Sequence, residues 1–295
     1  KVGKLAIAGV DGAGTEDGAP VTIRSGALTL EDADLAEVLK AAGASEEAGK
    51  NGRIGHMKWE SVDIVAPDKA SGPGKTVHIA FGSFELNSDY DGDTLKKGST
   101  VLKGLIVEPA PGSEFANNLS TLGYSRLELA AAIGAHYEAD AKALSLDDLT
   151  LEGVAMGSLG LKAHFADVDP TLMSGGKDER MQALFGCSIA ALEIKIVNAG
   201  LFEKALAYYA KQQGTTPDAL KQQISAAAVQ MVPLLLGGDP SAQKVASEAQ
   251  KFIDQPKNLT VTIKAKGDPL KAADFMGGDT SAIAAKLDIS ATANQ

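Results

Sequence analysis

The sequence predicts an α+β protein in which a long, curved antiparallel sheet packs against C-terminal helices. Three observations support this fold class. Apolar and polar residues alternate over much of residues 1–170, no helices separate the clearest strand-like stretches, and the last third changes to helical spacing before strand-like sequence returns. Because a large sheet needs its apolar face covered, we expect one architectural unit over residues 1–295. Residues 1–170 would form mainly an antiparallel β meander, and residues 171–295 mainly helices with returning strands.

The first part of the chain reads as strands and turns. KLAIAGV and PVTIRSGALTL are strand-like, and the glycine-rich DGAGTEDGA between them is typical of a hairpin loop. The period becomes helical in LTLEDADLAEVLKAAGA, where Leu35, Val38 and Leu39 share one helical face. Strands are expected again in HMKWESVDIVAPD, after SGPGKT and over residues 99–112, followed by a short helix in EFANNLSTLG.

The clearest strand pattern begins at Tyr124. In YSRLELAAAIGAHYEAD and AKALSLDDLTLEGVAMGSLGLKAHFADV, apolar residues recur at every second position. The spacing slips by one residue between Leu146 and Leu149, which predicts a β-bulge at Asp147–Asp148. Long alternating strands without intervening helices indicate an antiparallel meander with one buried face.

The last third contains the predicted helices, beginning with GLFEKALAYYAKQQG. In TPDALKQQISAAAVQMVPLLLGG, Thr216 is the expected N-cap, and Ile224, Met231 and Leu235 continue an apolar stripe. We expect these three side chains to face the sheet and to contact any apolar ligand held there, while Pro233 kinks or ends the helix nearby. A helix in DPSAQKVASEAQKFIDQ precedes strands in NLTVTIKAK and KLDISATA.

The segment SGPGKT, residues 71–76, is similar to the end of a phosphate-binding loop. The leading glycine of that motif would fall on Lys69, and the sequence that follows has the period of a strand. Because the phosphate would need the N-terminus of a helix, we interpret this segment as a turn between strands and expect no nucleotide binding through Lys75.

The best metal candidate is NSDYDGDT. Its residues Asn87, Asp89 and Asp91 stand at alternate positions before a glycine, as at the start of a calcium-binding loop. The glutamate that such a loop requires near its end falls on Gly98, and no helix clearly precedes the loop. An ordinary solvated hairpin is therefore the favoured alternative to a calcium site.

Catalytic motifs are missing from the sequence. None of the four histidines forms a short ligand pair, and no nucleophile elbow or dinucleotide-binding glycine motif is found. We therefore predict no catalytic residue and no cofactor, and we expect that the protein is not an enzyme. The four histidines, which we interpret as structural, are His56, His78, His136 and His164.

Charge and hydropathy limit the partners. The chain carries 38 acidic and 28 basic residues, a net charge of −10, and it has no arginine-rich run. Such a chain repels phosphate backbones, so nucleic-acid binding is not expected. No apolar run approaches the roughly 18 residues of a transmembrane helix.

The single cysteine and the start of the chain bear on its compartment. Cys187 excludes an intramolecular disulfide, and we interpret it as a small buried apolar residue. The chain begins in strand-like sequence without methionine, which suggests that an N-terminal segment was removed. A signal peptide, a lipid anchor and a membrane helix remain alternatives for that segment. We expect a soluble protein that is periplasmic or otherwise exported.

A resemblance supports this location. The order of elements in IKIVNAGLFEKALAYYAKQQG, the helix pair after it and QPKNLTVTIKAK resembles uncharacterised exported proteins of alphaproteobacteria, over about residues 192–290. The resemblance implies an envelope location and no activity.

Two functions from different classes follow. One is an envelope binding protein that holds an apolar ligand, such as a lipid, between sheet and helices, since an apolar pocket needs few polar anchors. The alternative is a structural or interaction protein with a fully packed core and no ligand. The sequence names no protein partner.

Overall fold

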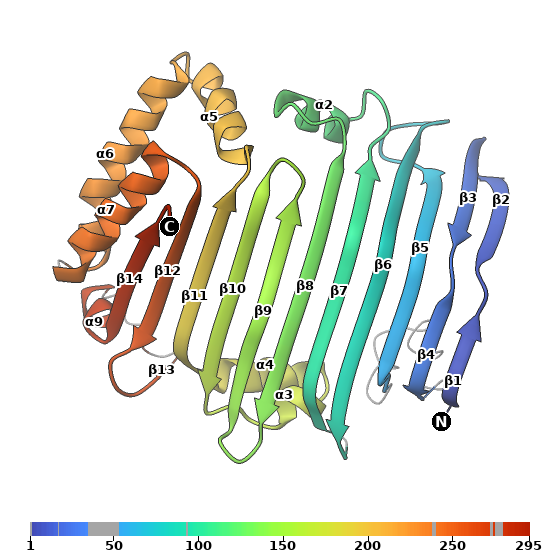
Figure 1. Ribbon diagram of the computed structural model, residues 1–295, viewed down its shortest axis with the longest axis horizontal. Coiled ribbons are helices and arrows are strands. Elements are labelled where there is room, and N and C mark those ends of the chain that lie inside the picture. Colours follow the sequence, from blue (N-terminus) through green and yellow to red (C-terminus); the bar gives the residue numbers. More distant parts are fainter. Residues whose placement is uncertain are drawn as a thin grey trace. The chain divides into compact units, whose positions relative to one another are not determined.

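A computed structural model of the chain describes residues 2–16, 18–34, 53–92, 94–237, 240–271, 274 and 280–295. Within these ranges, fourteen strands belong to antiparallel sheet, and helices pack on the C-terminal strands (Figure 1). The predicted α+β class is confirmed. The helix predicted around Leu35, Val38 and Leu39 lies outside the described residues.

The strands are β1 (Val2–Ile7), β2 (Val10–Glu16), β3 (Ala19–Ser25), β4 (Leu28–Ala33), β5 (His56–Pro67), β6 (Thr76–Asp91), β7 (Thr94–Glu108), β8 (Leu127–Glu138), β9 (Ala143–Gly153), β10 (Gly157–Ala166), β11 (Ser188–Asn198), β12 (Asn258–Ala265), β13 (Leu270–Lys271) and β14 (Leu287–Ala293). The helices are α2 (Glu114–Thr121), α3 (Thr171–Ser174), α4 (Lys177–Gly186), α5 (Leu201–Gln212), α6 (Pro217–Leu235), α7 (Pro240–Asp254) and α9 (Thr280–Ala285).

The chain divides into two compact units, residues 1–134 and 135–295, with the boundary inside β8. In the first unit the strand order is β1-β4-β5-β6-β7, while β3 also pairs with β5, and β2 pairs with β3. The strands β3 and β4 therefore follow one another along β5, interrupted at Gly26–Ala27.

Two details of this unit differ from the sequence prediction. The stretch PVTIRSGALTL forms two strands instead of one, because the chain breaks its ladder at Gly26. The predicted loop DGAGTEDGA is wrong over most of its length, since β2 continues to Glu16 opposite Ala19. Glycine is typical of loops, but its backbone can also extend and pair like that of any other residue.

The segment SGPGKT lies between β5 and β6, and a strand follows it directly. Its glycines Gly72 and Gly74 have positive φ, as turns require, and the Lys75 Nζ donates to the carbonyl of Pro111 at 3.1 Å. The predicted turn between strands is confirmed. Nucleotide binding itself stays untested, and the prediction that Lys75 does not support it stands.

In the second unit the order is β9-β10-β11-β12-β14, with β13 beside the start of β11. Between β9 and β10, Leu161 pairs with Leu149 but Ala163 pairs with Leu146, so β9 has one extra residue. This confirms the β-bulge predicted at Asp147–Asp148. Because the bulge restores the alternation, the apolar residues on both sides of it stay on one face of the sheet.

The C-terminal helices of this unit form a layer on the strands β12 and β14 (Figure 1). The hydroxyl of Thr216 accepts from the Ala219 N–H at 3.2 Å, which confirms the predicted cap of α6. Lys221 Nζ donates to the carbonyl of Asp254 at 2.5 Å and Ser225 donates to its carboxylate at 3.3 Å, so α6 is fastened to the end of α7. No helix among the described residues has the length and hydropathy needed to span a membrane.

Candidate functional site

The most prominent candidate site is the apolar face of the sheet in the second unit. Cross-strand partners share a face, so the strand register shows which side chains stand side by side. Reading from β9 through β10, β11 and β12 to β14, the register aligns apolar side chains in three rows. These rows are Leu151–Leu159–Ile196–Leu259–Ala293, Leu149–Leu161–Ile194–Val261–Ala291 and Leu146–Ala163–Leu192–Ile263–Ile289.

Helices cover the part of this apolar face that β12 and β14 form. On β14, Ile289 is 7% exposed and Ala291 is 3% exposed, and both pack with Val245 of α7. The helix α6 adds Val232 to the same cluster, and Leu236, directly after the end of α6, joins it. This cluster is the core between the helical layer and strands β12 and β14.

Polar contacts fasten the helical layer at the end of β14. Glu248 of α7 accepts from the Ala293 N–H at 2.9 Å, and the Asn294 amide donates to the carbonyl of Lys251 at 2.9 Å. A hydrogen bond from Lys251, followed by that from Ala293, lowers the pKa of Glu248 below its ordinary value. The carboxylate therefore stays charged where the helix meets the strand.

The part of this apolar face that β9 and β10 form is exposed to solvent. On β9 and β10, Leu151 and Leu159 are directly opposed and each is 50% exposed, although their row continues into the covered core. Leu149 is also exposed, and Leu161 is half-buried. We call these four residues the open face. Contiguous exposed apolar patches mark interaction sites more often than single exposed leucines do.

A cluster of buried residues closes one end of the face. Tyr137, Val168 and Cys187 form its centre, and Leu144 and Phe165 of the same sheet pack against them. The short helix α3 contributes Leu172 and Met173 to this plug. From Leu144 to Leu151 the strand extends about 20 Å, and at its far end the turn after Gly153 leaves Val154 exposed. The face is thus closed at the plug and open at the β9–β10 turn.

The single cysteine, Cys187, belongs to this plug of buried residues. The Cys187 thiol is buried and lies 3.2 Å from the carbonyl of Ala183, which confirms the predicted structural role. Burial raises its pKa, and the carboxylates of Asp167 and Asp169 raise it further. A thiol kept protonated in this way is a poor nucleophile.

The predicted ligand contacts Ile224, Met231 and Leu235 lie elsewhere. They are 39%, 56% and 59% exposed, so the prediction that they face the sheet is wrong. Their stripe is real, but only its start at Leu220 is covered, by Leu206 and Ala210 of α5. A different side of α6, with Val232, packs on the sheet together with Leu236, which directly follows the helix. The helix also continues through Pro233 to Leu235, so of the two predicted alternatives an end near Pro233 is wrong, and a kink there stays a prediction. The role of the three residues in ligand binding stays a prediction.

The calcium candidates are placed on a strand. Asn87, Asp89 and Asp91 alternate along the end of β6, in the hairpin with β7. Asn87 Oδ1 lies 2.7 Å from His56 Nδ1, and Asp91 pairs with Lys96 at 3.0 Å. Among the described residues, no three acidic, histidine or cysteine side chains gather in a metal-binding cluster. Calcium binding by this hairpin remains untested.

Two histidines lie in cross-strand charge ladders. In the first unit, His78 Nε2 lies 2.9 Å from Asp63 and its Nδ1 lies 2.9 Å from Glu108, which in turn pairs with Arg126. Hydrogen bonds to Asp63 and then to Glu108 raise the pKa of His78. Because both ring nitrogens are engaged, this imidazole has none left to accept a proton from a substrate.

The second ladder is built in the same way. His136 Nδ1 lies 2.7 Å from Asp147 and its Nε2 lies 3.3 Å from Glu138. The hydrogen bond to Asp147 is the main cause of its raised pKa. The bulge residue Asp147 thus serves cross-strand pairing, and both ladders support the predicted structural interpretation of these histidines.

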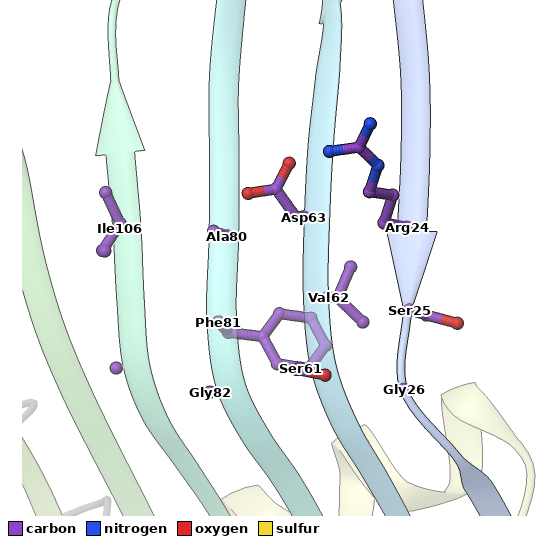
Figure 2. A pocket seen from close by; sticks show the side chains of 11 residues that line it. Arg24, Ser25, Gly26, Ser61, Val62, Asp63, Ala80, Phe81, Gly82 and Ile106 are labelled. Atoms are coloured by element: carbon purple, nitrogen blue, oxygen red, sulfur yellow. The ribbon is translucent and has the colours of Figure 1, made fainter. Parts of the chain in front are cut away.

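A shallow depression lies on the sheet of the first unit (Figure 2). It has a volume of about 520 Å³, and the small residues that line it are Gly26, between β3 and β4, and Ser61, Gly82 and Gly104 on β5, β6 and β7. Ser61 and Gly104 have φ of +34° and +64°, and a Cβ on Gly26 would lie 2.6 Å from the Ser61 hydroxyl.

These small residues mark a line where the apolar alternation of each strand shifts by one residue. The consequence is visible in Trp59 and Phe81, which stand on either side of the line and yet pack edge to face, with ring centroids 5.6 Å apart. Without the shift, Trp59 and Phe81 would point to opposite faces of the sheet. The line of small residues and the depression along it therefore have a structural explanation that requires no ligand.

Comparison with known proteins adds one finding. Residues 150–294 match the model of a family described as an uncharacterized protein. This range begins in β9 and includes the helical layer, and it contains the segment whose resemblance the sequence suggested. No curated protein matches the chain.

The sequence predicts the alternating leucines of β9 and β10, but its apolar stripe on α6 was the predicted ligand contact. The signal for the open face was the pattern itself: leucines on the consecutive strands β9 and β10, with the longer helices α5, α6 and α7 supplied only after β11. Helices that follow one end of a sheet reach the strands at that end first, and the earlier strands are left without a cover.

Proposed function

We propose that this chain is a non-enzymatic, exported envelope protein that holds a lipid or another aliphatic ligand on the open face. The observation that carries the proposal is the exposure of Leu151 and Leu159 at one end of an apolar row whose other end is a packed core. The resemblance to exported alphaproteobacterial proteins supports the location.

The chemistry of the open face favours an aliphatic ligand. Its four residues are all leucines, so it offers dispersion contacts and apolar burial without an aromatic platform or a charged anchor. Its direction is set by the plug at one end and by the exposed turn at Val154 at the other. An extended acyl chain along β9 and β10, with its polar end toward the turn, fits this arrangement.

The test compares lipid recovery from matched variants. The purified protein is extracted with organic solvent, and co-purified lipids are identified and quantified by mass spectrometry. In Leu151→Gln with Leu159→Gln, each side chain keeps about its size but loses its apolar character. Removing about 1.5 kcal/mol of contact should lower retained lipid about tenfold.

The control variant is Thr150→Gln with Ser158→Gln, one residue away on the same strands and on the opposite face. It should retain lipid like the unmodified protein. Both variants should keep the melting temperature, since none of the four side chains is buried. A well-folded protein without any bound lipid, or equal loss from both variants, would instead favour the alternative of a structural or interaction protein.

A further inference from the structure

The β-bulge of β9 lies at the boundary between the plug and the open face. Asp147 and Asp148 together stand opposite Lys162 of β10, where a regular strand would place one residue. Toward the plug, β9 continues with Leu146, which is half-buried, and toward the turn it continues with Leu149, which is 39% exposed. A bulge bends its strand and increases the local twist. The direction of the Leu149 side chain relative to the plug therefore depends on this extra residue.

The apolar pattern of β9 does not require the bulge. If one of the two aspartates were missing, Leu149 would follow Leu146 at the regular strand spacing, and both would share a face without any irregularity. The extra residue thus adds a bend and a second carboxylate to a strand that could align the same leucines without it. Bulges are common next to functional sites, where they redirect a side chain.

Both carboxylates of the bulge lie on the polar face of the sheet, opposite to the leucines. Asp148 accepts a hydrogen bond from the hydroxyl of Thr150, whose side chain alternates with the exposed leucines of β9. Asp147 accepts from Nδ1 of His136 at 2.7 Å. His136 precedes Tyr137 of the plug on β8 and therefore stands on the other face. The bulge is thus fastened to the adjacent strand from the polar side, and the leucines remain exposed on the apolar side.

We infer that His136 and Asp147 are positioning residues for the ligand of the open face. Their hydrogen bond holds the bend of β9 in one arrangement, so that Leu149 and Leu151 are already oriented when an aliphatic chain binds. Such preorganisation strengthens binding, because less conformational freedom is lost on association. Neither His136 nor Asp147 touches the ligand, since both lie on the opposite face. The inference rests on the proposed function.

Binding of cis-parinaric acid to the delipidated chain provides the measurement. The fluorescence of this unsaturated fatty acid increases in apolar surroundings, so its Kd can be compared among variants at constant pH. Asp147→Ala and His136→Ala should each raise the Kd about threefold or more, and the double variant should raise it no further, because the two side chains act as one unit. Asp147→Asn should bind like the unmodified chain, since its amide oxygen still accepts from His136.

Stability measurements separate positioning from a merely structural role. The side chains of His136 and Asp147 are 35% and 46% exposed, so their contact adds little to the free energy of unfolding, and both alanine variants should keep the melting temperature. The matched control is Asp63→Ala, which breaks the comparable contact with His78 in the first unit. It should leave the Kd unchanged.

Deletion of Asp148 tests the bulge itself. The shortened strand keeps its leucines on one face but loses the bend, so the Kd should rise at least as much as in Asp147→Ala. A folded deletion variant that binds the fatty acid like the unmodified chain overturns the inference, as does an unchanged Kd in both alanine variants or an equal loss in Asp63→Ala. If the deletion variant does not fold, the alanine variants decide alone.

The leucine variant Leu151→Gln with Leu159→Gln distinguishes failure of this inference from failure of the proposed function. Loss of fatty-acid binding in that variant, with unchanged binding in the His136 and Asp147 variants, contradicts only the positioning role. A folded chain that binds no fatty acid and yields no lipid on extraction contradicts the proposed function, and the positioning role with it.

Discussion

The two sides of the apolar face in the second unit have similar sequence but different surroundings. On β14, Ala291 packs with Val245 of α7 and Ala293 is buried, whereas on β9 and β10 their row partners Leu149, Leu151 and Leu159 are exposed. Alternation alone would assign both sides to a core. The comparison teaches that a strand pattern defines which face is apolar, while the helices that reach it define how much of that face is core.

The largest expected effect separates these two sides by stability. Ile289→Ala should lower the free energy of unfolding by about 2–5 kcal/mol, because it removes apolar contacts and leaves a cavity under α7. Leu159→Ala, in a half-exposed position, should cost about 1 kcal/mol or less. Chemical denaturation of the two variants provides the measurement, and equal losses would show that the open face is packed as tightly as the covered one.

A second comparison applies the same test to the stripe of α6. Leu220→Ala should lower the free energy of unfolding by about 2–4 kcal/mol, because Leu220 is buried against α5. Ile224→Ala, one turn later and at an exposed position, should lower the free energy of unfolding by less than about 1 kcal/mol, since alanine also favours the helix. Thermal unfolding of both variants decides; a large loss at Ile224 would mean that the stripe is covered in solution.

The smallest expected effect concerns pH. The raised pKa of His78 and of His136 means that each stabilises the fold fully below the ordinary histidine value of 6.5 and loses that contribution as pH rises through the raised value. Glu108 has a lowered pKa, so its contribution is present above 4.5 and is lost in acid. We therefore expect the ladders to stabilise the protein most between about pH 4.5 and 6.5.

Denaturation midpoints measured from pH 3 to 9 check this expectation. The double variant His78→Gln with His136→Gln should reduce the loss of stability as pH rises on the alkaline side. Either single variant should reduce that loss in part. Glu108→Gln should instead reduce the acid-side slope. A double variant whose profile matches that of the unmodified protein would show that the two ladders do not control this dependence.

Some features of the molecule were determined by local sequence. The alternation from Tyr124 onward predicted the strands, the slip between Leu146 and Leu149 predicted the bulge, and the Thr216 hydroxyl marked the start of α6. The segment SGPGKT was assigned to a turn because the residues after it extend. Each of these depends on side-chain direction or on a hydrogen bond within a few residues, so neighbouring residues suffice to specify it.

Other features were decided only by tertiary structure. The stripe with Ile224, Met231 and Leu235 has helical spacing, but spacing does not say which neighbour will cover it, and α7 packs against Val232 and the sheet cluster instead. Likewise, the leucines of β9 and β10 alternate like those of a covered strand, and their exposure depends on how far the helical layer reaches. Periodicity states which side chains can be buried together; whether they are buried depends on the position of another element, which lies far away in the sequence.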